Sequence, residues 1–299
     1  MLTKTFNPPS VTRKTQRVDT KNASARCKVL NVAVPSSSHR KGTQSSLGDE
    51  EYINNAKMLI KALQVYLSVG KSPFTNMHLV PSLVDTNQLY SIFDGKKILD
   101  FGCGGGRMLT GLKSLSICYK QYVGVDVSEK EISYLQTMYK DEDDKEKHLF
   151  FHSNVKNAQY NPKGNELTDG SYSDHITGLE NMHDSFDIIH LRSVFSHMTL
   201  EEIDHHLELF RSYLKYDPSN AKNSGVLVVS LFVRDDMEVD EEENPSYYNM
   251  NKSPLHKSVM SSFRFLKLLQ KADFHISFMT TLSSQDTSYV LKPGQKQHN

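Results

Sequence analysis

The stretch Lys97-Ile-Leu-Asp-Phe-Gly-Cys-Gly-Gly-Gly106 decides the expected fold of this chain. Residues 98–101 form a short apolar run that predicts a buried strand, and the glycines after it predict a sharp turn into a helix. In an open sheet of parallel strands, ligands bind at such turns, beyond the carboxyl ends of the strands. The stretch therefore predicts either a ligand site at the head of the first strand or a glycine-rich turn that holds no ligand.

Strands and helices alternate along the rest of the chain. Further strands are predicted at residues 122–125, 148–152, 186–191, 226–232, 274–280 and 287–291, and helices at residues 106–114, 128–139, 200–213 and 259–271. Ser128 and Glu131 form a predicted capping box at the start of the second of these helices. This alternation predicts βαβ units, and hence an α/β fold whose mainly parallel sheet carries helices on both faces.

The N-terminal residues differ in charge from the rest of the chain. Residues 1–48 hold nine lysines and arginines and one acidic residue, although the whole chain has a net charge of zero. This composition predicts a disordered basic leader, with organellar import or contact with nucleic-acid phosphates as alternatives. We expect one domain at residues 49–293, opened by a helical cover at residues 51–68 and 84–93, and a flexible tail at residues 294–299.

Other features limit the classes of protein and site. No run of about 18 apolar residues is present, so no membrane span is expected. None of the three cysteines forms a CxxC pair, and no metal site is predicted. Residues 157–184 and 234–254 are expected to be long loops, the second with a solvated acidic run at residues 240–243. A cytoplasmic protein is expected, and its oligomeric state is left open.

The spacing of the glycines discriminates between cofactors. A dinucleotide-binding turn needs G-x-G-x-x-G, whose third glycine would fall at Arg107, whereas this chain has Gly102, Gly104 and Gly106. S-adenosylmethionine lacks the pyrophosphate that a helix N-terminus attracts, and brings an ammonium, a sulfonium, a carboxylate and a ribose. The spacing favours this cofactor and disfavours a nicotinamide oxidoreductase.

Two carboxylates suit the same ligand. Asp100, beside the turn, suits the cationic amino-acid end, directly or through water. Asp126, at the end of the second strand, can accept hydrogen bonds from two ribose hydroxyls. A dehydrogenase would use Asp126 in the same way, so this residue indicates a nucleoside without choosing the cofactor.

Residues 98–109 resemble the first motif of class I S-adenosylmethionine-dependent methyltransferases. Tyr-Asn-Pro-Lys-Gly at residues 160–164 and the stretch at residues 186–198 are similar to a bacterial subgroup with Tyr-Asn-Pro-x-Gly and Ser-Val-Phe-Thr-His-Met in this order. The resemblance covers roughly residues 90–292. It implies a Rossmann-like, seven-stranded sheet with an antiparallel C-terminal strand, and a methyltransferase activity.

The resemblance also implies site residues. Asn154 stands where the family usually has an acid near the adenine, and its amide can still bind the adenine amino group. The cofactor-binding residues expected are Asp100, Gly102, Cys103, Gly104, Gly106, Arg107, Asp126, Val127, Asn154, Val155, His190 and Leu191.

Residues just after the fourth strand face the methyl group in this fold. We therefore expect His197 to be the catalytic base, with a purely structural histidine as the alternative. Arg192 and Ser193 are expected to contact the acceptor, and Tyr160 and Asn161 either line its pocket or belong to a simple turn.

The acceptor itself is left open by the sequence. A small-molecule or glycan-type acceptor is expected. Acceptor specificity in such folds lies in loops. One alternative is an RNA cap or base methyltransferase that uses the leader, although the acidic body disfavours it. The other is a non-catalytic methyltransferase-like interaction module.

Overall fold

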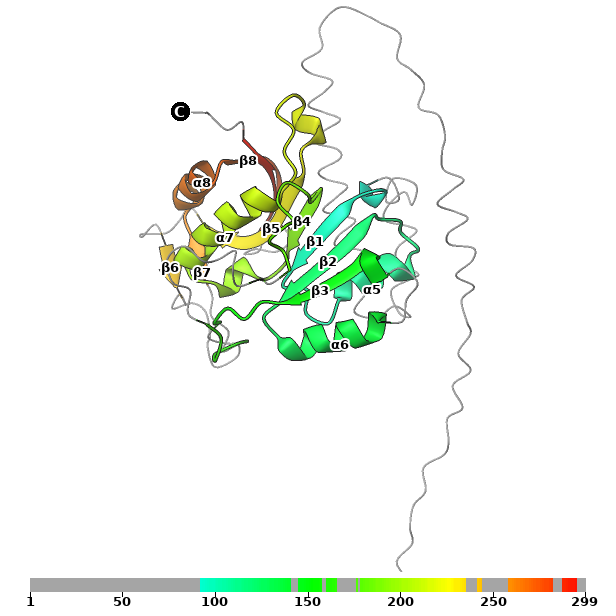
Figure 1. Ribbon diagram of the computed structural model, residues 1–299. Coiled ribbons are helices and arrows are strands. Elements are labelled where there is room, and N and C mark those ends of the chain that lie inside the picture. The colour runs from blue at the N-terminus through cyan, green and yellow to red at the C-terminus, as the bar shows by residue number, and fades with distance from the viewer. Residues whose placement is uncertain are drawn as a thin grey trace, which may run out of the picture. The chain divides into compact units, whose positions relative to one another are not determined.

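A mixed β-sheet forms the centre of the part of the chain that the structure describes (Figure 1). The computed structural model describes residues 92–140, 145–157, 160–165, 176, 178–234, 241–243, 258–281 and 287–294. The expected leader at residues 1–48, the helix at residues 51–68 and residues 295–299 of the tail lie outside these ranges. Of the helix expected at residues 84–93, Ile92 and Phe93 are described, and both are helical.

Seven strands of the sheet agree with the sequence prediction. Their order is β3-β2-β1-β4-β5-β9-β8, parallel throughout except that β9 runs antiparallel to both of its neighbours. The mainly parallel sheet with an antiparallel C-terminal strand is thereby confirmed. The bounds are β1 (Lys97–Phe101), β2 (Gln121–Asp126), β3 (His148–His152), β4 (Ile188–Leu191), β5 (Val226–Val233), β8 (Phe274–Thr281) and β9 (Thr287–Pro293).

Two short strands extend the sheet beyond the prediction. β6 (Glu241–Glu243) pairs antiparallel with β7 (Ser258–Met260), which pairs with the end of β5. The acidic run expected to be a solvated loop thus contributes a strand. Val259 and Met260, expected to begin a helix, lie in β7, and α8 (Ser262–Lys271) begins after Ser261, whose hydroxyl accepts from the Arg264 N–H at 3.1 Å.

Helices cover both faces of the sheet, as the sequence predicts. Alternate residues of a strand point to opposite faces, so Ile98 joins one buried cluster and Leu99 the other. Residues of α5 (Arg107–Ser114) and α6 (Glu129–Tyr139) belong to the first cluster, and those of α7 (Leu200–Tyr213) and α8 to the second (Figure 1). Single-turn helices in the described ranges include η1 (Lys145–Lys147), η3 (Phe195–His197) and η4 (Ala221–Asn223).

The starts of α6 and α7, like that of α8, are fixed by hydroxyl caps. Ser128 Oγ accepts from the Glu131 N–H at 3.4 Å, which confirms Ser128 as the N-cap of α6. A reciprocal capping box is formed by Thr199 and Glu202 at the start of α7. Among the described residues, no helix is long and apolar enough to cross a membrane.

His206 makes the stability of this fold sensitive to pH. It lies on α7 against the rings of Phe101 and Phe210, with Nδ1 donating to the Glu202 carbonyl at 2.7 Å. Burial lowers the pKa of His206 from 6.5 to about 4, so the unfolded chain takes up a proton before the folded chain does. We expect the free energy of unfolding to fall by about 3 kcal/mol as the pH drops from 6.5 to 4.

Urea titrations of the wild type and of His206→Gln across this pH range measure the effect. The glutamine would keep a side-chain donor but cannot titrate. The free energy of unfolding of the variant should therefore lack the fall that His206 causes between pH 6.5 and 4. Parallel pH profiles for the two proteins would show that His206 is not responsible.

Candidate active site

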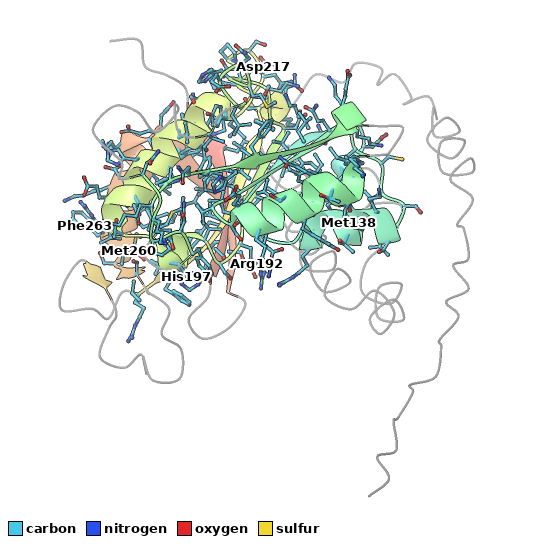
Figure 2. The ribbon with its side chains drawn as sticks, turned by 60° about the horizontal axis from the view of Figure 1, so that its bottom comes forward. Met138, Arg192, His197, Asp217, Met260 and Phe263 are labelled. Carbon is cyan, nitrogen blue, oxygen red and sulfur yellow. The ribbon has the colours of Figure 1, made fainter. Side chains whose placement is uncertain are left out.

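A cavity of about 440 Å³ opens at the carboxyl ends of β1, β2, β3 and β4. This volume lies in the range of small-ligand pockets, roughly 300–1,000 Å³. Figure 2 shows Arg192 and His197 along one edge of the molecule and Asp217 at the opposite edge. The lining consists of Phe101, Gly102, Gly104, Gly105 and Arg107; Val125, Asp126, Val127, Ser128 and Glu131; Ser153, Asn157 and Tyr160; and Arg192, Ser193, Val194, His197 and Met198.

The glycine turn after β1 is fixed to its neighbours on both sides. The N–H groups of Gly102 and Cys103 both donate to the carbonyl of Val125, at 2.7 and 3.0 Å. A Cβ added to Gly102 would lie 2.4 Å from Cγ2 of Val194, so the turns after β1 and β4 are in contact. A Cβ added to Gly104 would meet nothing within 4 Å. The turn therefore leaves open space at Gly104, where a ligand can approach the backbone closely.

Asp126 is held in the cavity wall by two backbone donors. Its Oδ2 accepts from the Gly104 N–H at 2.7 Å, and its Oδ1 accepts from the Ser128 N–H at 2.8 Å. Such charge-assisted bonds are short and strong. Each carboxylate oxygen keeps a second lone pair, so the side chain can accept two further hydrogen bonds from a ligand.

Asp100 has a different environment from the one expected. Its Oδ2 accepts from the Tyr122 hydroxyl at 2.5 Å, and its Oδ1 lies 2.9 Å from His190 Nδ1. The three side chains come from β1, β2 and β4 and are almost fully buried. Burial, and then the charge of Asp100, raise the pKa of the Tyr122 phenol well above its usual value. Asp100 thus ties three strands together behind the cavity and does not line it.

The turn after β4 has an unusual backbone. Ser193 has a φ of 56°, in the left-handed region that residues with a side chain rarely adopt. Its N–H donates to the hydroxyl of Ser230, a buried residue of β5, at 3.0 Å. Residues in such conformations concentrate at functional sites. This hydrogen bond links the turn directly after Arg192 to β5.

His197 and Tyr160 both line the cavity, and their rings lie next to each other. Their ring centroids are 6.4 Å apart in an edge-to-face arrangement. The His197 N–H donates to the Val194 carbonyl at 2.9 Å, within the turn of η3. Asn161 donates to the carbonyl of Val155 at 3.0 Å and exchanges backbone hydrogen bonds with Asn157. Asn161 thus forms part of the turn that carries Tyr160. A turn at this position is one of the two alternatives that the sequence leaves open.

Nine of the expected site residues line the cavity, and eight do not. Those that line it are Gly102, Gly104, Arg107, Asp126, Val127, Tyr160, Arg192, Ser193 and His197. Those that do not are Asp100, Cys103, Gly106, Asn154, Val155, Asn161, His190 and Leu191. Asn154, expected near the adenine, is exposed, and its Oδ1 accepts from Asn161 at 3.3 Å.

Sequence reasoning missed several lining residues. The sequence predicts Ser128 and Glu131 to cap a helix, and their position just after Asp126 is a signal for a place in the site. Asn157 and Met198 carry no comparable signal, because the path of their loops depends on packing between distant segments. The other missed residues are Phe101, Gly105, Val125, Ser153 and Val194.

Comparisons with known proteins place this chain beside methyltransferases. Among similar solved structures is an S-adenosylmethionine-dependent methyltransferase from Mesorhizobium loti, 12% identical, covering 72% of this chain and 96% of that chain, with a TM-score of 0.44. Another is a chain of the complex between the Haloferax volcanii Trm112 methyltransferase activator and the putative methyltransferase, 11% identical, covering 84% and 97%, with a TM-score of 0.47. A family model described as a methyltransferase domain matches residues 77–277, more than half of the chain. The protein therefore belongs to this family of methyltransferase domains.

Proposed function

We propose that the protein transfers a methyl group from S-adenosylmethionine to a small-molecule or glycan-type acceptor bound beside His197. One observation carries this proposal: a single cavity joins the glycine turn and Asp126 to Tyr160, Arg192 and His197. The cofactor supplies a methyl group on a positively charged sulfur, open to in-line attack. The two sets of residues would hold the donor and the acceptor next to each other, and positioning of this kind is worth up to about 7–11 kcal/mol.

The residues on the cofactor side fit its chemistry. Asp126 would accept hydrogen bonds from the two ribose hydroxyls with its remaining lone pairs. The open space at Gly104 admits the ligand next to the backbone. Arg107, the first residue of α5, would bind the carboxylate of the amino-acid end. Val127 and Ser153 line the part of the wall after β2 and β3, where we place the adenine.

The boundaries of the catalytic domain are also a proposal. We place the domain at residues 49–293, which contain the matched residues 77–277. The proposed leader at residues 1–48 and tail at residues 294–299 contribute no residue to the described lining of the cavity.

His197 is proposed to take the proton of the acceptor. Its edge-to-face contact with Tyr160 orients the imidazole. We expect His197→Ala to lower the turnover number about a hundredfold, the low end of the range for general bases, because the sulfonium leaving group is already activated. Affinity for S-adenosylhomocysteine should stay within about twofold, since the residue lies on the acceptor side. Unchanged turnover would instead assign His197 a structural role.

The acceptor class can be tested with radiolabelled S-adenosylmethionine. The full-length protein is incubated separately with the small-molecule, RNA and protein fractions of cells that lack its gene. We expect label in the small-molecule fraction, and none with Asp126→Asn at the same concentration. Label in RNA that requires residues 1–48 would favour the RNA methyltransferase. Failure to bind S-adenosylhomocysteine in calorimetry would contradict the proposed function and favour the non-catalytic module.

A further inference from the structure

Arg192 is a positive charge in the cavity wall that no residue in the described part of the chain pairs. The residue follows β4 directly, is half-buried and lines the cavity. Within the ranges that the structure describes, its guanidinium makes no hydrogen bond or ion pair. A guanidinium offers five donors in a planar fork that matches carboxylate and phosphate oxygens. An arginine in a cavity without such a partner is suited to bind one from a ligand.

The position of Arg192 is set by the fold. The next residue, Ser193, is held in the left-handed region by its hydrogen bond to Ser230. Val194, one residue further, packs against Gly102. Figure 2 shows Arg192 on the same edge of the molecule as His197. The arginine thus belongs to the turn that leads to the proposed base, and two fixed contacts hold that turn.

The cavity would carry a net positive charge with S-adenosylmethionine bound and no anionic acceptor. Its ionised lining residues, within the described part of the chain, are Arg107, Arg192, Asp126 and Glu131, whose charges cancel. S-adenosylmethionine would add two positive groups and one carboxylate, and therefore one net positive charge. The carboxylate of the cofactor can pair with one arginine. We assign it to Arg107, because this residue directly follows the glycine turn. The loaded cavity then has one net positive charge, and Arg192 has no anionic partner among its described lining residues.

We propose that the acceptor carries an anionic group, a carboxylate or a phosphate, that Arg192 binds beside the atom presented to His197. This inference rests on the proposed function, because it assumes that the cofactor occupies the glycine side of the cavity. It narrows the acceptor from any small molecule or glycan to an acidic one. An acceptor with one negative charge would leave the loaded cavity neutral.

The test uses simple ligands that differ in charge. Benzoate, phenyl phosphate and the neutral benzamide are titrated by calorimetry into the full-length protein saturated with S-adenosylhomocysteine. We expect at least one of the two anions to bind at least about tenfold more tightly than benzamide. The tighter of the two anions identifies the source of the charge as carboxylate or phosphate. Equal affinity for benzamide and both anions would overturn the proposal.

Two matched variants separate the two arginines. Arg192→Gln should remove the preference for anions while the affinity for S-adenosylhomocysteine stays within about twofold. Arg107→Gln should weaken S-adenosylhomocysteine and keep the preference for anions. A loss of S-adenosylhomocysteine affinity in Arg192→Gln as large as in Arg107→Gln would overturn the proposal, because Arg192 would then bind the cofactor.

The experiments distinguish an error in the proposed function from an error in this inference. If S-adenosylhomocysteine does not bind the wild type, the proposed function is contradicted. The same anions are then titrated into the unliganded protein. An anion preference that Arg192→Gln removes still supports an anion site at Arg192, and its absence overturns that site as well.

Discussion

Replacement of Gly102 with alanine will lower the affinity for S-adenosylhomocysteine about a thousandfold. The residue has a φ of 77°, and the new Cβ would lie 2.4 Å from Cγ2 of Val194. The left-handed backbone costs about 1–2 kcal/mol for a residue with a side chain, and overpacking typically costs about 1–3 kcal/mol more. Relief of the clash must displace the turn whose N–H groups bond to Val125. About 4 kcal/mol of lost binding corresponds to a thousandfold.

Gly95 offers a matched control for the backbone. It has a φ of 67°, but a Cβ there would meet nothing within 4 Å. Gly95→Ala should therefore lower the thermal midpoint by a few degrees and leave ligand affinity unchanged in calorimetry. If the clash is the cause, Gly102→Ala combined with Val194→Ala should recover much of the affinity, because Cγ2 is removed. Wild-type affinity in Gly102→Ala would show that the turn is not part of the binding site.

Replacement of Asp126 with asparagine should cause the next largest loss, about a hundredfold in affinity for S-adenosylhomocysteine. Each carboxylate oxygen accepts a backbone N–H, from Gly104 and Ser128. An amide presents one acceptor oxygen, so its NH₂ group must face one of these N–H donors. The ribose hydroxyls would also lose a charged acceptor. Hydrogen bonds to charged groups contribute about 1.5–3 kcal/mol, which corresponds to roughly a hundredfold.

Asp217 provides the control for this substitution. It also accepts backbone N–H groups, from Ser219 and Asn220, and hydrogen bonds led by the Ser219 hydroxyl lower its pKa to about 2. Figure 2 shows Asp217 at the opposite edge of the molecule from Arg192 and His197. Asp217→Asn should thus change a similar cap without affecting ligand binding. Equal losses in the two variants would mean that Asp126 acts through general stability rather than through the ligand.

The parts of the fold that the sequence predicts are those with a local signal. β3 and α7 have the bounds expected from their apolar patterns, and Ser128 caps α6 as predicted. β6 and β7 have three residues each, too few for a periodic pattern. They are strands because they pair with each other and with the end of β5, which no local pattern records.

The same distinction applies to the candidate site. Gly102, Gly104 and Asp126 line the cavity because short stretches of chain place them at strand ends. Asp100 is equally visible in the sequence, yet its surroundings depend on Tyr122 and His190, which come from other strands. The cavity-lining position of Asn157 also depends on contacts between distant segments. Such contacts are formed by the tertiary fold and leave little trace in the order of residues.

The buried contact of Asp100 with Tyr122 and His190 limits how the binding turn can be exchanged between proteins. A graft of residues 97–106 into another sheet would transfer the glycines together with this carboxylate. Without a phenol and an imidazole on the two adjoining strands, the grafted acid would be buried with no hydrogen-bond donor, and an uncompensated buried charge costs several kcal/mol. The transplantable unit is therefore a set of three strands, and chimaeras should be cut outside β1, β2 and β4.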